Sequence, residues 1–254
     1  MDQGELTYIK IPYPKTEDLH LKILVPLCSL IISPGIGNAW VTGKYHDPKD
    51  VMALNVTQEG NVAEIVAVGA FAYRVPRKFL PALTLSLGRL HPFSLSISAG
   101  DLIDHLDLGA IPLSSLEIHY GEGSQSIDFS YPNPQLLNRM KIEADKGPVQ
   151  IEHLANANAA VIQLNGDSAH YRLNFGGELK RTTNLHAGMA VSTTEVFIPS
   201  AAAVKVKSRT PPASSQTDDF IYVDKEYCNR AARDRQEPLL DINAPYGVLK
   251  IHYF

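Results

Sequence analysis

The dominant pattern in this chain is a short alternation in which a polar residue stands between two apolar ones. A period of two is typical of half-buried β-strands, because successive side chains of a strand point to opposite faces. Apolar residues at helical spacing are nearly absent, apart from 103–108 and 226–233. The pattern therefore predicts an all-β chain.

These apolar triplets recur at a nearly constant interval, in two interleaved series. The first series contains the triplets 95–97, 116–118, 140–142 and 162–164. The second series contains the triplets 106–108, 127–129, 149–151, 171–173 and 196–198. Neighbouring triplets of one series begin 21 to 25 residues apart. An internal repeat of this length is typical of a solenoid, in which each repeat forms one coil.

Glycines recur between the two triplets of each unit. They are Gly100, Gly121 with Gly123, Gly147 and Gly166, and Gly188 precedes the last triplet. A tight corner needs a residue that tolerates positive φ, which favours glycine, or asparagine as in the segment 154–158. We therefore expect a parallel β-solenoid with coils of about 22 residues and a glycine or asparagine at the corners.

We expect a single elongated domain over residues 1–254. Its regular coils cover about 93–206, its lateral loops about 207–238, and its C-terminal coil 239–254; weaker triplets at 21–23, 30–32, 54–56 and 63–65 are interpreted as earlier coils. Nine or ten coils spaced like hydrogen-bonded strands would extend over roughly 45 Å. Because the end coils of a solenoid expose unpaired strand edges, we expect 2–15 and 248–254 to cap them.

The stretch 93–206 resembles the toast-rack domain of LiaF-type cell-envelope proteins and of adhesin-like proteins of unknown function. The resemblance rests on LSISAGDLIDHLDLGAIPLSSLEIHYGEGS (95–124), SYPNP (130–134), IEHLANANAAVIQLNGDSAHYRLNFGG (151–177) and FIPSAAAVKV (197–206), and AWVTGKYHD (39–47) is similar to an early coil of that family. It implies a single right-handed parallel β-helix in a bacterial cell-envelope context. The resemblance implies no catalytic residue. The sequence shows no pattern for the transmembrane helices that precede the domain in LiaF-type regulators.

Composition narrows the choice of partner. Hydrophobic residues make up 44% of the 254 residues, which is enough for a sizeable core. Lysine and arginine total 23 against 27 aspartates and glutamates, for a net charge of −4. This balance argues against a nucleic-acid partner bound through its phosphates. A protein or a glycan partner stays open.

Two further features concern location. The most apolar stretch, 21–37, is interrupted by Pro26 and Pro34 and is too short to span a membrane. We expect neither a signal peptide nor a membrane span, and therefore a cytoplasmic protein or the soluble part of a larger envelope protein. Cys28 and Cys228 cannot build a disulfide framework and have no zinc-site spacing, so we expect two buried thiols.

Candidate chemistry is confined to the outward residue of each triplet. One outward column should read Ser96, Glu117, Lys141 and Gln163, and the other Asp107, Asp128, Gln150 and Arg172. The simplest interpretation of both columns is a solvated face. Two carboxylates one coil apart, Asp107 and Asp128, would also suit a calcium ion or the paired acids of glycoside chemistry. Catalytic and cofactor motifs are otherwise missing, so no catalytic residue and no cofactor are expected.

Taken together, these features predict a non-enzymatic β-helix interaction or scaffold module, envelope-associated or adhesin-like. The alternative is a carbohydrate-active β-helix enzyme, of the polysaccharide lyase or hydrolase type, that uses the outward carboxylates. Unpaired strand edges additionally suggest an edge-mediated homo-oligomer.

Overall fold

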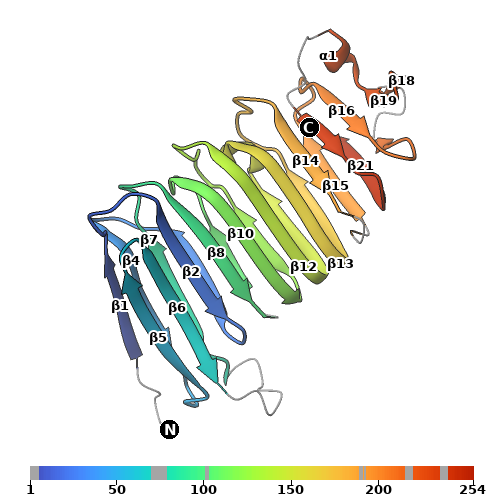
Figure 1. The fold of residues 1–254 in the computed structure, drawn as a ribbon. Helices are drawn as coiled ribbons and strands as arrows, with labels where there is room; N and C mark the ends of the chain where they lie inside the picture. The colour runs from blue at the N-terminus through green and yellow to red at the C-terminus, as the bar shows by residue number, and fades with distance from the viewer. Residues whose placement is uncertain are drawn as a thin grey trace.

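The computed structural model describes residues 6–69, 79–100, 103–188, 191, 193–214, 220–234 and 240–254. Its elements are almost all strands, which confirms the prediction of an all-β chain. The described strands form one hydrogen-bonded sheet of 21 members, with both parallel and antiparallel pairs. Figure 1 shows them as an elongated row that leads from the N-terminal strands to the C-terminal ones.

Strand pairing divides this sheet into two stacks. The first stack holds, in spatial order, β5 (Met52–Glu59), β6 (Val62–Gly69), β2 (Leu19–Val25), β8 (Phe93–Ala99), β10 (Leu113–Glu122), the first half of β12 (Leu137–Glu152), the first half of β13 (Ala159–Asn174), β14 (Thr183–Ala187), β20 (Leu240–Asn243), β16 (Val204–Lys207), β19 (Glu226–Cys228) and β18 (Ile221–Val223).

The second stack is formed by the remaining strands and by the second halves of the two longest ones. It holds β1 (Leu6–Pro12), β4 (Ala39–His46), β7 (Ala82–Leu87), β3 (Ser29–Pro34), β9 (Ile103–Asp107), β11 (Gln125–Asp128), the second halves of β12 and β13, β15 (Thr193–Ile198), β21 (Val248–Tyr253) and β17 (Ala213–Ser214). Apart from these strands, a short 3-10 helix η2 (Leu154–Ala157) and a single-turn helix α1 (Arg230–Arg233) are present.

The apolar triplets form the core, as their alternation predicts. In the first stack, Ile97, Ile118, Ile142 and Leu164 lie in register on neighbouring parallel strands. Each is at most 1% exposed. Burying a side chain of this size contributes about 1.5–3 kcal/mol, so each such column stabilises the stack along its length.

The predicted left-handed corners are found in part, since Gly100, Gly121, Gly166 and Gly188 do not have positive φ. Gly123 and Gly147 have φ of +131° and +105°, and Asn158, at the end of η2, has φ of +54°. A Cβ on residue 147 would collide with the Gly123 carbonyl oxygen of the neighbouring layer. Glycine is therefore needed at 147 both for its backbone conformation and for the close approach of two stacked corners.

The N-terminal end departs from the expected parallel arrangement. β4 runs antiparallel to both β1 and β7, and β5 and β6 form an antiparallel hairpin. The interpretation of 54–56 as an inner coil triplet is wrong, because β5 is an edge strand and Val56 is 39% exposed. Its two-residue connection, Gly60 and Asn61, is a hairpin signal that fits this outcome. The sheet is therefore mixed, and a uniformly parallel solenoid is not confirmed.

Spatial order differs from chain order at both ends. β6 pairs with β2, and β2 pairs on its other side with β8, so the later strand β6 lies outside the earlier one. At the other end, β20 lies between β14 and β16, and β21 lies between β15 and β17. The expectation that 248–254 caps the stack is therefore wrong for β21, which is an inner strand.

Several remaining expectations can be placed. β1 lies inside the predicted cap 2–15 and is the outermost described strand at the N-terminal end of the second stack. Residues 2–5 lie outside the described part. The helical spacing at 103–108 is misleading, since 103–107 is strand β9. Cys28 and Cys228 are buried and form no disulfide. Among the described residues, no helix combines the length and the apolar content needed to cross a membrane.

Candidate interaction surface and pocket

The first outward column lies as the sequence predicts. Ser96, Glu117, Lys141 and Gln163 are in register on β8, β10, β12 and β13. Lys141 Nζ donates to Glu117 Oε1 at 2.8 Å, and this hydrogen bond lowers the pKa of Glu117. Both side chains are partly exposed, so the pair contributes well under about 1 kcal/mol. This column is a paired, solvated face.

In the second outward column, the register expected from the sequence is correct only for the first two residues. Asp107 and Asp128 lie opposite each other on β9 and β11. The next residue in register with Asp128 is Glu152, not Gln150. Gln150 lies opposite Ser126 and Arg172, in the neighbouring row. Three successive strands therefore bring three carboxylates into one row, which we call the acidic row: Asp107, Asp128 and Glu152.

Each carboxylate of the acidic row has a hydrogen-bond partner of its own. Asp107 accepts from the Ser130 hydroxyl at 2.7 and 2.8 Å and from the Gly109 amide at 2.9 Å. Asp128 Oδ1 lies 2.7 Å from Nδ1 of His153, whose backbone has left-handed φ at a corner. The acidic row is thus held by local contacts that the sequence did not reveal.

Glu152 is bound from both sides. Its carboxylate accepts from Asn174 Nδ2 at 2.6 Å and from Gln150 Nε2 at 2.7 Å. Among the described residues, no cluster of three or more histidine, cysteine, aspartate or glutamate side chains is arranged to hold a metal ion. A calcium ion between Asp107 and Asp128 stays a prediction.

Aromatic side chains contact one another on β15 and β21 of the second stack. Phe197 stacks on His252 with ring centroids 4.5 Å apart and planes 16° from parallel. The Arg172 guanidinium also lies over the Phe197 ring, 4.5 Å from its centroid. These two groups already contact the Phe197 ring. The ring therefore stabilises the second stack and does not offer a free surface for a ligand.

Large exposed apolar side chains occur at both ends of the stacks, and seven of them lie at the N-terminal end. Six belong to β1, β2, β3, β5 and β6, and a seventh follows β3. Figure 1 shows β1, β2, β5 and β6 together at one end of the row. These are Leu6, Tyr8, Leu24, Ile31, Ile36, Val56 and Val68. Tyr8 is 78% exposed and Ile36 is 97% exposed. Leu24, Val56 and Val68 belong to the first stack, whereas Leu6, Tyr8 and Ile31 belong to the second, and Ile36 borders Lys10 and Pro12 of β1. Because the two stacks enclose one core, their outer sides face away from each other. We call the four residues on the side of the second stack, Leu6, Tyr8, Ile31 and Ile36, the N-terminal apolar surface.

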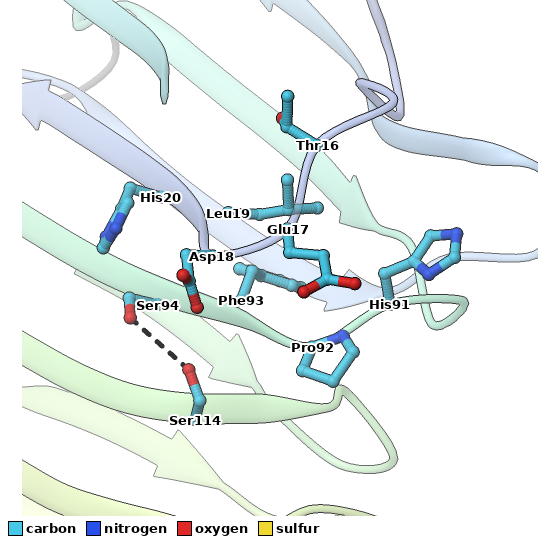
Figure 2. A pocket seen from close by; sticks show the side chains of 10 residues that line it. All are labelled: Thr16, Glu17, Asp18, Leu19, His20, His91, Pro92, Phe93, Ser94 and Ser114. Carbon is cyan, nitrogen blue, oxygen red and sulfur yellow. Dashed lines mark hydrogen bonds between the residues drawn. The ribbon is translucent and has the colours of Figure 1, made fainter. Parts of the chain in front are cut away.

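A pocket of about 580 Å³ opens where β2, β8 and β10 begin. Its apolar part is formed by Leu19 and Phe93, whose side chains are buried, and by Pro92. Glu17 and Asp18 come from the segment before β2, and His91 from the segment before β8. Figure 2 shows the carboxylates of Glu17 and Asp18 at the opening, with His91 on one side of them and Ser94 and Ser114 on the other.

An aromatic cluster supports the pocket from behind. The Tyr13 ring meets His91 edge-on with centroids 5.0 Å apart and stacks on Trp40 at 6.2 Å. Trp40 in turn meets Phe93 edge-on at 5.9 Å. The Tyr13 hydroxyl accepts a hydrogen bond from the Leu90 amide at 3.1 Å. Burial raises the pKa of Tyr13.

The segment before β2 is also fixed in place. Asp18 has a left-handed φ of +56°. Its carbonyl oxygen accepts from Asn61 Nδ2 at 2.8 Å, and the His20 amide donates to the Asn61 carbonyl oxygen at 2.9 Å. Asn61 belongs to the hairpin connection between β5 and β6. The pocket therefore depends on the fold-back of β6 beside β2, which the sequence analysis did not predict.

Comparison with solved structures finds likeness over the whole chain. A "putative cell adhesion protein" from Clostridium sporogenes matches with a TM-score of 0.51 and 16% identity, covering 99% of each chain. A "putative adhesin" from Bacteroides fragilis matches with a TM-score of 0.42 and 10% identity, covering 100% of this chain and 98% of the other. The first likeness indicates a shared overall fold.

Sequence comparison adds no family. No family model matches this sequence, so the resemblance to the toast-rack domain is not confirmed. No curated protein matches it either. Neither of the two structural neighbours is named as an enzyme.

Proposed function

We propose that this chain is a non-enzymatic, adhesin-like interaction module of the bacterial cell envelope, with the N-terminal apolar surface as its contact face. The observation that carries the proposal is the exposure of Tyr8 and Ile36 (78% and 97%) on one side of the N-terminal end of the second stack. Exposed apolar side chains gathered at one place mark interaction sites more often than isolated ones do. The fold likeness to a protein named for cell adhesion supports the same function.

The architecture suits such a role. We infer that the two stacks are the walls of a single elongated β-solenoid domain of the toast-rack type. In-register parallel pairing from β8 to β15 and the glycine corners support this inference. Adjoining layers of a solenoid contact only their neighbours, so an end of the stack can present a contact surface without altering the core.

Co-sedimentation with isolated bacterial envelopes and with insoluble cell-wall polysaccharides tests this function. We expect the purified chain to pellet with at least one of them, and Tyr8→Ser with Ile36→Ser to reduce the bound fraction several-fold, because apolar contact area is lost. Val248→Ser is the matched control, since Val248 is 52% exposed but lies far along the stack. No binding to any of these materials, or equal loss in the control, would contradict the proposal.

The same tubes separate binding from catalysis. Each is assayed with and without calcium, for bound protein and for released sugar ends. Release that is abolished by Asp107→Asn or Asp128→Asn would replace this proposal with a carbohydrate-active enzyme. Binding that needs calcium and is lost in the same variants would support a cation site at the acidic row.

We further propose that two copies pair through β1. β1 has β4 as its one described neighbour, so its other edge has no partner among the described strands. An antiparallel pair of β1 strands centred on Ile9 would place Tyr8 of each copy opposite Lys10 of the other, both on the outer face. A lysine ammonium beside a tyrosine ring is favourable, and the two outer-face pairs would be equivalent by symmetry.

Light scattering during size exclusion tests this pairing. We expect a mass that rises toward the dimer with concentration, and a monomer for Tyr8→Lys, because the introduced ammonium group would then repel Lys10 across the pair. Val68→Lys is the control, since Val68 is 53% exposed but belongs to β6 in the first stack. A monomer at several hundred micromolar would contradict the proposal.

A further inference from the structure

We propose that the pocket at the start of β2, β8 and β10 binds a primary ammonium group carried on a hydroxylated ring, as in an amino sugar. Its volume of about 580 Å³ lies within the range of small-molecule sites, and it is a concave site with both apolar and polar walls. This inference does not depend on the adhesion proposal, because it concerns a different set of residues and a soluble ligand.

The charge of the pocket selects the cation. Glu17 and Asp18 line it, and its described lining contains no lysine or arginine. Neither carboxylate takes part in an ion pair with a cationic side chain in the described part of the chain. By contrast, Glu64 on the adjacent strand β6 is paired with Lys22 at 2.9 Å. The pocket therefore offers two carboxylates with free acceptor capacity, which favour an ammonium donor and disfavour an anion.

The remaining lining selects the body of the ligand. The Ser94 and Ser114 hydroxyls lie 3.4 Å apart, and each keeps further capacity to donate or accept. His20, His91 and Thr16 add polar atoms around the opening. Pro92 is exposed at the pocket, and Leu19 and Phe93 form its buried apolar floor. A ring with hydroxyl groups on its rim and C–H groups on its faces matches this division, whereas a purely aliphatic amine would leave the polar groups without partners.

The pocket is also preorganised. Leu19 and Phe93 are first residues of β2 and β8 and lie opposite each other in register. The aromatic cluster of Tyr13, Trp40 and Phe93 packs behind them. The floor of the pocket is therefore carried by packed strands, which hold their geometry well, and the segment that carries Asp18 is held by the hydrogen bond from Asn61.

Nuclear magnetic resonance with the isotope-labelled full chain tests the inference. Glucosamine is the probe, and glucose and N-acetylglucosamine are the comparison sugars, since they lack a charged amine. We expect saturable amide shifts with glucosamine at residues 16–20, 91, 93, 94 and 114. The comparison sugars should bind at least about tenfold more weakly, because they lose the charge-assisted hydrogen bonds. Cyclohexylamine should also bind more weakly than glucosamine, because it lacks the hydroxyl groups.

Two conservative variants localise the effect. Glu17→Gln and Asp18→Asn each remove a charge with little change in shape, and asparagine tolerates the left-handed backbone at 18. We expect each to weaken glucosamine binding at least about tenfold. Glu59→Gln, on the exposed edge strand β5, is the matched control and should bind as the parent does.

Several outcomes would overturn the proposal. These are no saturable shift with glucosamine, saturable shifts at other residues, equal affinity for glucose, equal loss in the Glu59→Gln control, or unchanged binding in both pocket variants. A chain that adheres to envelopes but fails this titration would reject the pocket proposal alone. A chain that binds glucosamine but no envelope material would reject the adhesion proposal alone.

Discussion

Replacing Ile251 by alanine, close to the end of this chain, is expected to lower the free energy of unfolding by about 2–5 kcal/mol. Ile251 is fully buried. It lies in register with Val196 of β15 on one side and Ser214 of β17 on the other. The truncation would therefore leave a cavity between two layers, as at a mid-chain core position, and not at a frayed end.

Equilibrium unfolding in urea measures this change. Val248→Ala is the matched control, because Val248 begins the same strand but is 52% exposed, and we expect less than about 1 kcal/mol there. If the two variants lost equal stability, or if Ile251→Ala cost less than about 1 kcal/mol, β21 would not be an inner strand of the stack.

Asn229→Ala is expected to lower the free energy of unfolding by about 2–4 kcal/mol. Asn229 is 3% exposed, and its Oδ1 accepts from the Ala232 amide at 2.9 Å and from the Val204 amide at 3.0 Å. Its Nδ2 donates to the Ala202 carbonyl oxygen at 2.8 Å. One side chain thus caps α1 and ties it to the start of β16, and alanine would leave buried backbone groups without partners.

Urea unfolding together with amide hydrogen exchange tests this role. We expect faster exchange at Val204 and Ala232, because both amides lose their acceptor. Asn184→Ala is the control, since Asn184 makes one side-chain hydrogen bond of 3.4 Å at a half-buried site. Equal stability and unchanged exchange in Asn229→Ala would show that water or a neighbouring group replaces the side chain.

The central layers could be predicted because the local pattern and the tertiary pairing agree there. The column from Ser96 to Gln163 follows directly from the first series of triplets. The corner glycines at 123 and 147 could be predicted for the same reason, since a left-handed backbone and a close approach both favour glycine.

The acidic row shows where this reasoning fails. The triplet 149–151 has the same alternation as 127–129, but Ile127 pairs with Ile151. A period of two looks identical after a shift by two residues, so periodicity cannot distinguish Gln150 from Glu152 as the neighbour of Asp128. The apolar pattern is interrupted at His153, which occupies the corner in a left-handed conformation.

The pocket could not be predicted for a different reason. Glu17 and Asp18 are separated from His91 by more than seventy positions along the chain, and the three carry no motif. They meet because β2 pairs with β8, while β6 folds back to the other side of β2. Long-range strand order places these side chains together, and no local signal encodes that order.

By itself, the sequence determined the strand content, the inward and outward faces of the central strands, and the residue types at the left-handed corner positions 123, 147 and 158. These depend on alternation and on backbone conformation, which are local properties. Only the tertiary structure decided the order of the layers, the antiparallel pairs at the N-terminal end, the inner position of β21 and the residues that line the pocket. An apolar strand can bury its inward face equally well beside several neighbours, so the choice among them depends on the packing of the whole stack.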